Sequence, residues 1–180
     1  MPFLKPAAFD LETLFLPEEA QGTPPASQRL AVACLLIEGE QPRFFEEKDA
    51  FELLKQLARK DLLIIGHNII KFDYEVLRPY WPEGVVEELA PRTFDTMLEL
   101  ARYTRKWHGL SDLAWLNFGE KKLENSKEAP SLWRSGERER VKKYCAHDAW
   151  LALRLYKLGT PFGKIRVPHG NSVKEILVSW

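Results

Sequence analysis

The amino-acid sequence predicts an α/β fold in which a mixed sheet is flanked by helices. Strand-like segments come first, a strongly apolar segment at residues 62–65 lies between two helical patterns, and residues 137–158 form a long closing helical pattern. Strands followed by helices that alternate with a central strand are typical of such layered folds. With 180 residues, 45% of them hydrophobic, the chain can bury one substantial core and is too short for a second full-sized domain.

Strands are expected at residues 5–12, 29–38 and 42–45. The second contains the apolar run Leu-Ala-Val-Ala-Cys-Leu-Leu-Ile, and a turn with Gly39 leads to the third. Residues 16–28 are expected to form an extended loop, because four residues interrupt any periodic pattern there: Pro17, Gly22, Pro24 and Pro25.

Residues 49–60 are predicted to form an amphipathic helix. Its apolar face is expected to consist of Phe51, Leu54, Leu57 and Ala58. Residues 62–65 predict a central strand buried on both faces, and the helix that follows is expected to end at Pro79. The later segments are a short strand or helix start at 92–97, a helix at 110–116 and the closing helix at 137–158.

The charges balance, but they are unevenly distributed. The 26 basic residues offset 26 acidic ones, which excludes a polycation that holds nucleic acid by bulk charge. Residues 1–90 carry 9 basic and 16 acidic side chains, whereas residues 91–180 carry 17 and 10. Cys34 and Cys145 have neither zinc-site nor disulfide spacing. No apolar run approaches the roughly 18 residues of a membrane span, and the first residues lack the pattern of a signal peptide. We therefore expect a cytoplasmic protein without a membrane partner.

Two acidic residues mark the end of the first expected strand. Asp10 and Glu12 are two residues apart, so their carboxylates lie on the same face, while Phe9 and Leu11 face the other way. Adjacent carboxylates repel each other unless a cation neutralises them. An isolated Asp-x-Glu pattern is also common at a solvated strand end.

Two further acids follow in polar surroundings. Asp73 comes shortly after the Gly66-His67-Asn68 stretch that ends the most apolar strand, and the carboxyl ends of central strands are where sites in such sheets form. Helix capping alone would explain an acid in a first helical turn but not the polar stretch before it. In the closing helix, Tyr144 and Asp148 are four residues apart and share a face. A core tyrosine and an ion-paired aspartate are the alternatives there.

Together, the three segments resemble the motifs of the DEDD (DnaQ-like) superfamily of 3'-5' exonucleases, which has the ribonuclease H-like fold with a central mixed five-stranded sheet. The matching residues are Asp10-x-Glu12-Thr13, Asn68 with Phe72-Asp73, and Tyr144-x-x-x-Asp148. Lys143 stands where one branch of the superfamily has His, so Tyr144 indicates the tyrosine (DEDDy) branch. The last motif is most similar to the proofreading domain of family B DNA polymerases.

The resemblance covers about residues 7–158. We therefore assign residues 1–158 to an exonuclease domain. Residues 159–180 are a C-terminal extension of unknown role, which could cap the core, pair with an edge strand or join a partner.

The resemblance implies a site with two divalent cations, and hard oxygen ligands favour Mg²⁺ or Mn²⁺. Asp10 would bridge both ions, Glu12 and Asp148 would complete the site of the first, and Asp73 would serve the second, largely through water. Tyr144 is expected to stay protonated and to orient the attacking water.

Three residues are candidates for substrate binding. The resemblance places the backbone N–H of Thr13 and the side chain of Leu14 at the terminal nucleotide. Asn68 either binds substrate or braces the site. The role of His67 is open, whereas Phe72 is expected in the core and His147 in a structural or surface position.

The predicted function is a metal-dependent 3'-5' exonuclease that releases nucleoside 5'-monophosphates from single-stranded DNA ends in repair or replication. A polymerase or helicase on a separate chain is a candidate partner. Three alternatives stay open: an exoribonuclease that trims RNA or short oligonucleotides, a catalytically silent nucleic-acid-binding subunit, and a ribonuclease H-like endonuclease.

Several side chains are candidates for contact with a nucleic acid backbone. The basic ones form three clusters: Arg102, Arg105 and Lys106; Lys121 and Lys122; and Arg134, Arg138, Arg140, Lys142 and Lys143. The last cluster is also compatible with a solvated helix face, because Glu137 and Glu139 are interleaved with it. Stacking surfaces or buried packing are the two alternatives for Trp107, Trp115 and Trp133.

Overall fold

A mixed five-stranded sheet forms the centre of the computed structural model, which describes residues 4–120 and 127–180. The strand order is β3-β2-β1-β4-β5. The bounds are β1 (Lys5–Thr13), β2 (Leu30–Ile37), β3 (Arg43–Glu46), β4 (Leu62–Gly66) and β5 (Thr93–Asp95). β1 pairs antiparallel with β2 and parallel with β4, so the sheet changes from antiparallel to parallel at β1. The predicted α/β fold is confirmed.

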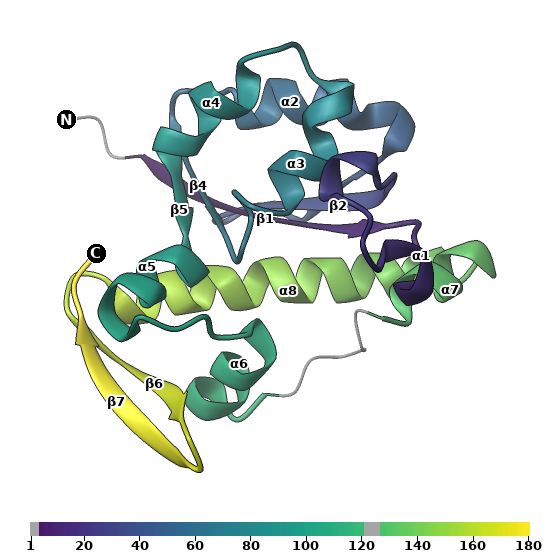
Figure 1. Cartoon of the computed structure of the whole chain (residues 1–180). Coiled ribbons are helices and arrows are strands. Elements are labelled where there is room, and N and C mark those ends of the chain that lie inside the picture. Colours follow the sequence, from purple (N-terminus) through teal and green to yellow (C-terminus); the bar gives the residue numbers. More distant parts are fainter. Residues whose placement is uncertain (1–3, 121–126) are drawn as a thin grey trace.

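Helices cover both faces of this sheet (Figure 1). α8 (Arg138–Gly159) runs along one face, and the other face carries α2 (Ala50–Leu57), α3 (Asp73–Leu77) and α4 (Val85–Leu89). α5 (Thr96–Thr104) and α6 (Leu110–Phe118) lie on the α8 side. The sheet is therefore the middle layer of three.

Short helical turns occupy several connections. Residues 16–28, predicted as an extended loop, contain α1 (Pro17–Ala20) and the 3₁₀ turn η1 (Pro25–Ser27). Pro17 and Pro25 stand at first helical positions, where a missing N–H costs nothing, so proline starts these turns rather than preventing them. The other short elements are η2 (Glu47–Asp49), η3 (Arg78–Tyr80), η4 (Ala90–Arg92) and α7 (Ala129–Arg134).

The predicted apolar face of α2 is wrong in two residues. The helix buries Ala50, Leu53, Leu54 and Leu57, which follow the i, i+3, i+4, i+7 spacing of one helical face. Phe51 is 55% exposed and Ala58 is also exposed. The predicted face began at Phe51, whereas the buried face begins one residue earlier at Ala50, which belongs to the core cluster on this side of the sheet.

Alternation along β1 sends successive side chains into different layers. Ala7, Phe9 and Leu11 join the cluster under α2, α3 and α4, where the Phe9 ring lies 6.4 Å from that of Tyr74. Ala8 points to the opposite layer and packs with Cys145 of α8. The same alternation turns Asp10 and Glu12 toward α8.

The C-terminal residues form a separate antiparallel hairpin of β6 (Gly163–His169) and β7 (Ser172–Val178). Ile165 and Val178 pack in a cluster with Leu151 of α8. The ring of Trp180 lies against Gly159, and its Nε1–H donates to the Tyr156 carbonyl at 2.8 Å. Residues 159–180 thus cover the C-terminal half of α8 and do not pair with the main sheet (Figure 1).

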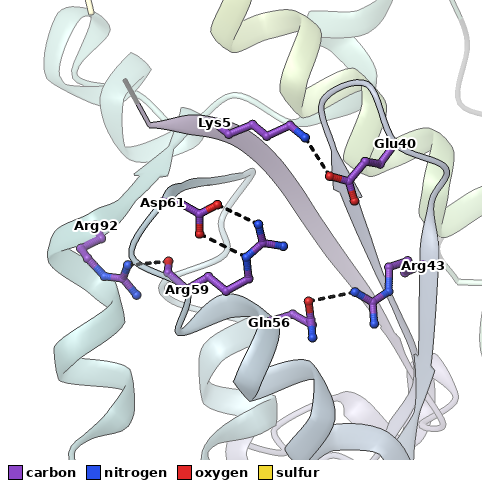
Figure 2. A network of polar contacts seen from close by, with 7 residues as sticks. All are labelled: Lys5, Glu40, Arg43, Gln56, Arg59, Asp61 and Arg92. Atoms are coloured by element: carbon purple, nitrogen blue, oxygen red, sulfur yellow. Dashed lines mark hydrogen bonds and ion pairs between the residues drawn. The ribbon is translucent and has the colours of Figure 1, made fainter. Parts of the chain in front are cut away.

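Polar contacts tie together the chain segments near the start of β1 (Figure 2). Lys5 pairs with Glu40 at 2.7 Å, and Arg59 pairs with Asp61 at 2.7 Å. Arg92 donates to the Arg59 carbonyl at 2.9 Å. Because exposed ion pairs contribute little to stability, these contacts fix positions more than they hold the fold together. Among the described residues, no helix is both long and apolar enough to cross a membrane.

Leu151→Ala is expected to lower the free energy of unfolding by about 2–5 kcal/mol, because it leaves a cavity between α8 and the hairpin. Urea unfolding followed by circular dichroism measures the change. Leu177→Ala on β7 is the matched control: this leucine is 73% exposed, so its loss should change stability by less than about 0.5 kcal/mol. Equal effects of the two substitutions would contradict the packing of the hairpin on α8.

Candidate active site

Three carboxylates converge between β1 and α8. One oxygen each of Asp10, Glu12 and Asp148 lies within 4.8 Å of the other two. Glu12 and Asp148 are buried and Asp10 is half-buried. The strand places the first two on the face toward α8, and the helix brings the third to meet them.

Tyr144 lies one helical turn before Asp148 and is 1% exposed. Its hydroxyl hydrogen-bonds to Asp148. Burial, followed by the nearby charges of Glu12, Asp148 and Asp10, holds the pKa of this hydroxyl well above its ordinary value. Tyr144 therefore keeps its proton at neutral pH.

Asp73 begins α3 and approaches the same place from the β4 side. Its Oδ1 accepts a hydrogen bond from the Leu11 N–H at 3.1 Å, between the two acids of β1. Asp73 lies outside the group of three carboxylates whose oxygens meet within 4.8 Å. Burial and the charges of Asp95 and Asp148 raise its pKa well above the usual range, although the Leu11 bond opposes this.

The pKa values of the two buried cysteines near the site are also raised. Burial, followed by the charge of Asp10, raises the pKa of Cys34 to about 12. The same two causes raise the pKa of Cys145, whose thiol lies 3.3 Å from the Asp10 carbonyl oxygen. Both cysteines are free thiols in the core, so neither is a metal ligand or an accessible nucleophile.

A cavity of about 550 Å³ opens above the carboxylates. It is lined by seven of the eight residues that sequence analysis proposed for the site: Asp10, Glu12, Thr13, Asn68, Asp73, Tyr144 and Asp148. Leu14 is the exception, since it lines a neighbouring groove together with Trp133. The structure therefore brings the predicted residues together and separates Leu14 from them.

Thr13 is placed by an irregularity of the sheet. The register between β1 and β2 shifts between Glu12 and Thr13, which interrupts the backbone ladder where the predicted donor N–H lies. The Thr13 hydroxyl donates to Gln28 at 3.2 Å, and the next N–H, that of Leu14, donates to the Arg29 carbonyl at 2.9 Å. Gln28 also lines the cavity, a position that the sequence did not indicate.

Asp95 holds the turn that carries Asn68, and sequence analysis missed it. Asn68 has φ 64°, a left-handed conformation that needs support. The carboxylate of Asp95 is 2% exposed and accepts the N–H groups of Asn68 at 2.9 Å and Ile70 at 3.2 Å. It also caps α5 by accepting from Met97 and Leu98. An acid directly before a helical segment is the signal that was overlooked.

The two histidines near the motifs have bracing positions. His67 contacts the Thr96 hydroxyl at 2.8 Å and donates from Nε2 to the His108 carbonyl at 3.0 Å. His147 is not among the residues that line the cavity, and its Nε2 lies 3.5 Å from a Glu120 carboxylate oxygen, which fits the structural position expected for it. Phe72, expected in the core, is half-buried and packs against the core while lining the cavity.

The basic clusters differ in how they are neutralised. Most of the cluster before Tyr144 is paired, as shown by the contacts Arg134–Glu19, Arg138–Glu46, Arg140–Glu137 and Lys142–Glu139. Arg102 pairs with Glu99. Lys121 and Lys122 lie outside the described residues.

The three candidate stacking tryptophans also differ. Trp133 is buried under the Arg138 guanidinium, whose Cζ lies 5.0 Å from the ring centroid. Trp107 and Trp115 are exposed by 58% and 54%. Buried packing therefore accounts for one of the three.

The sequence matches a 3'-5' exonuclease family over residues 36–158. The chain belongs to this 3'-5' exonuclease family. The matched segment contains Asp73, Tyr144 and Asp148, and the fold adds Asp10 and Glu12 to them. Exonucleases of this family require divalent metal ions, and the converging carboxylates of Asp10, Glu12 and Asp148 fit such ions because all three offer hard oxygen ligands.

The fold of this exonuclease is similar to that of the family B DNA polymerase from the hyperthermophilic archaeon Pyrobaculum calidifontis, with a TM-score of 0.66 and 16% sequence identity. The alignment covers 89% of the exonuclease chain and 25% of the polymerase chain, so the exonuclease spans about a quarter of that protein's length. The likeness confirms the ribonuclease H-like fold. No match was found among the curated proteins.

Asp95→Ala is expected to lower the free energy of unfolding by about 2–4 kcal/mol, because four N–H groups lose a buried charged acceptor. Asp95→Asn, which keeps one oxygen, should lose less. Guanidinium chloride unfolding measures both. Asp61→Ala, at an exposed ion pair, is the control that should leave stability unchanged. A stable Asp95→Ala variant would show that other contacts hold the turn.

Proposed function

We propose that this exonuclease hydrolyses single-stranded DNA from the 3' end with two divalent cations, Mg²⁺ or Mn²⁺, and releases nucleoside 5'-monophosphates. One observation carries the proposal: the carboxylates of Asp10, Glu12 and Asp148 converge beside a protonated Tyr144 at the floor of a cavity. In a member of a 3'-5' exonuclease family, this is the arrangement that phosphodiester hydrolysis requires.

The carboxylates define where the cations would bind. Asp10, Glu12 and Asp148 would hold one ion, and Asp73, which lines the same cavity, would serve the second with Asp10. Carboxylate oxygens without Cys or His in the group favour Mg²⁺ or Mn²⁺ over zinc. Bound cations supply a water of lowered pKa and neutralise charge on the phosphate.

Tyr144 acts as a hydrogen-bond donor in this proposal. A phenol whose pKa is raised by burial and by three carboxylates cannot serve as a general base at neutral pH. Its hydroxyl, already directed at Asp148, orients the attacking water.

The substrate-binding roles divide among three residues. The N–H of Thr13, at the interrupted ladder, would bind the terminal nucleotide, and Asn68, which lines the same cavity on its braced turn, would contact it as well. Leu14 lies in the adjoining groove, so it would contact a neighbouring base instead of the base of the terminal nucleotide.

DNA is the favoured substrate because the similar fold belongs to a DNA polymerase. The proposal places the exonuclease in DNA repair or replication. A polymerase or helicase on another chain would supply the 3' end.

With Mg²⁺ or Mn²⁺, the protein is expected to shorten a 5'-labelled single-stranded DNA from its 3' end, and EDTA should stop the reaction. Asp10→Asn and Asp148→Asn should lower kcat by roughly a hundredfold or more, because each removes a carboxylate ligand. Gel analysis of the products measures this. Asp61→Asn, an exposed aspartate outside the cavity, is the matched control and should keep full activity.

The same assay separates the alternatives. Folded protein that leaves the strand intact with both metals would overturn the proposal. Faster hydrolysis of the matched RNA would replace the DNA part of it, because discrimination rests on the 2'-hydroxyl. Cleavage of a circular single strand would indicate an endonuclease.

Tyr144→Phe is expected to lower kcat by about tenfold to a hundredfold while KM stays within a few-fold, since the ring still fills the core but no longer positions the water. Steady-state kinetics on a single-stranded DNA measures both constants. Tyr156→Phe, on the same helix and packed against Phe94, should behave like the wild type. Full activity of Tyr144→Phe would remove the hydroxyl from the mechanism.

A further inference from the structure

We propose that four exposed residues beside the cavity form a binding surface for the single strand upstream of its 3' end. These residues, the Trp107 platform, are Lys71, Arg105, Lys106 and Trp107. Trp107 would stack a nucleobase, and the three cations would contact phosphates. The inference rests on the proposed function in one respect, that a strand with its 3' end in the cavity is the ligand.

The platform adjoins the cavity through both of its chain segments. Lys71 immediately precedes Phe72 and Asp73, which line the cavity. Trp107 immediately precedes His108, whose carbonyl accepts from His67 on the cavity wall at 3.0 Å. The two segments meet where the Lys71 Nζ lies 4.2 Å from the centroid of the Trp107 ring. A strand leaving the cavity on this side would meet the indole first.

Trp107 is exposed in a turn that the protein holds in place. It is 58% exposed, whereas Trp81 is buried and donates its Nε1–H to the Ala50 carbonyl. Arg105 ends α5 in a left-handed conformation with φ 60°. The hydroxyl of Thr104 accepts from the Lys106 N–H at 3.3 Å and contacts His108 Nε2 at 3.0 Å. A fixed exposed ring loses little conformational entropy on binding.

The cations of the platform are available to phosphates. Lys71, Arg105 and Lys106 have no carboxylate within ion-pair distance in the part of the chain that the structure describes. This distinguishes them from the paired cluster before Tyr144, where Arg134 and its neighbours would have to exchange a glutamate for a phosphate. Asp112, at the start of α6, is the nearby acid that partly offsets them.

A single-stranded nucleic acid fits this combination better than other anions. Every nucleobase has a π-face, so stacking on an indole is tolerant of sequence, and the backbone supplies one charge per nucleotide to the flanking cations. Lys71 covers one face of Trp107, which leaves the rest of the exposed ring for a base. The platform is therefore expected to extend binding without adding sequence preference.

Binding to fluorescein-labelled oligothymidylate, followed by anisotropy in EDTA, tests the platform without hydrolysis. Trp107→Ala should weaken binding of a strand of about ten nucleotides by about fivefold to a hundredfold, and Trp107→Tyr should recover most of it. The loss should be small for a dinucleotide, which fills only the cavity. Lys71→Ala should reduce the slope of log affinity against log salt by about 0.7.

Phe51 and Lys55 provide the matched control, because they form an exposed pair of the same kind on α2, with Lys55 Nζ 5.4 Å from the ring centroid. Phe51→Ala and Lys55→Ala should bind the long strand like the wild type. Thermal unfolding checks that every variant is folded.

The outcomes separate the two proposals. If Trp107→Ala binds the long strand as tightly as the wild type, or loses the same factor on the dinucleotide, the platform is wrong even where hydrolysis is normal. If the wild type hydrolyses nothing but its binding depends on Trp107 and on strand length, the platform stands and the proposed hydrolysis fails.

Discussion

Helix α8 lies close to β1 because the side chains between them are small, and the site depends on this approach. Ala8 and Cys34 of the sheet share one buried cluster with Cys145 and Ala149 of the helix. A larger side chain at any of these positions would push the helix away from the sheet. Asp148 immediately precedes Ala149, so the thickness of this apolar layer sets the distance between its carboxylate and those of β1.

The same packing gathers like charges in a place of low dielectric, which opposes folding. The raised pKa of Asp73, caused first by burial and then by nearby carboxylates, expresses this cost. Apolar clusters on both faces of the sheet must offset it, and they occupy the strand residues that alternate with the acids. Cations bound only by the folded chain would add to stability by mass action. The proposed chemistry and the stability of the fold are thus linked through one group of carboxylates.

The sequence predicted the parts of the structure that local patterns determine. Alternation placed Asp10 and Glu12 on one face, and helical spacing placed Tyr144 beside Asp148. It failed where contacts between distant segments decide. α2 buries Ala50 instead of Phe51 because packing against the sheet decides which helical face is buried. The cap that Asp95 forms on α5 has a local signal, but its hydrogen bond to Asn68, 27 residues away in the sequence, has none. Leu14 leaves the cavity because the strand irregularity lies just before it.

The hydrogen bond from Cys145 to the Asp10 carbonyl joins residues 135 positions apart. The carboxylates of β1 and α8 therefore come together only when almost the whole domain has been synthesised and has folded. A nascent or partly unfolded chain contains every acidic residue of the site but not their arrangement. Assembly from distant segments thus delays the arrangement of the carboxylates until folding is nearly complete.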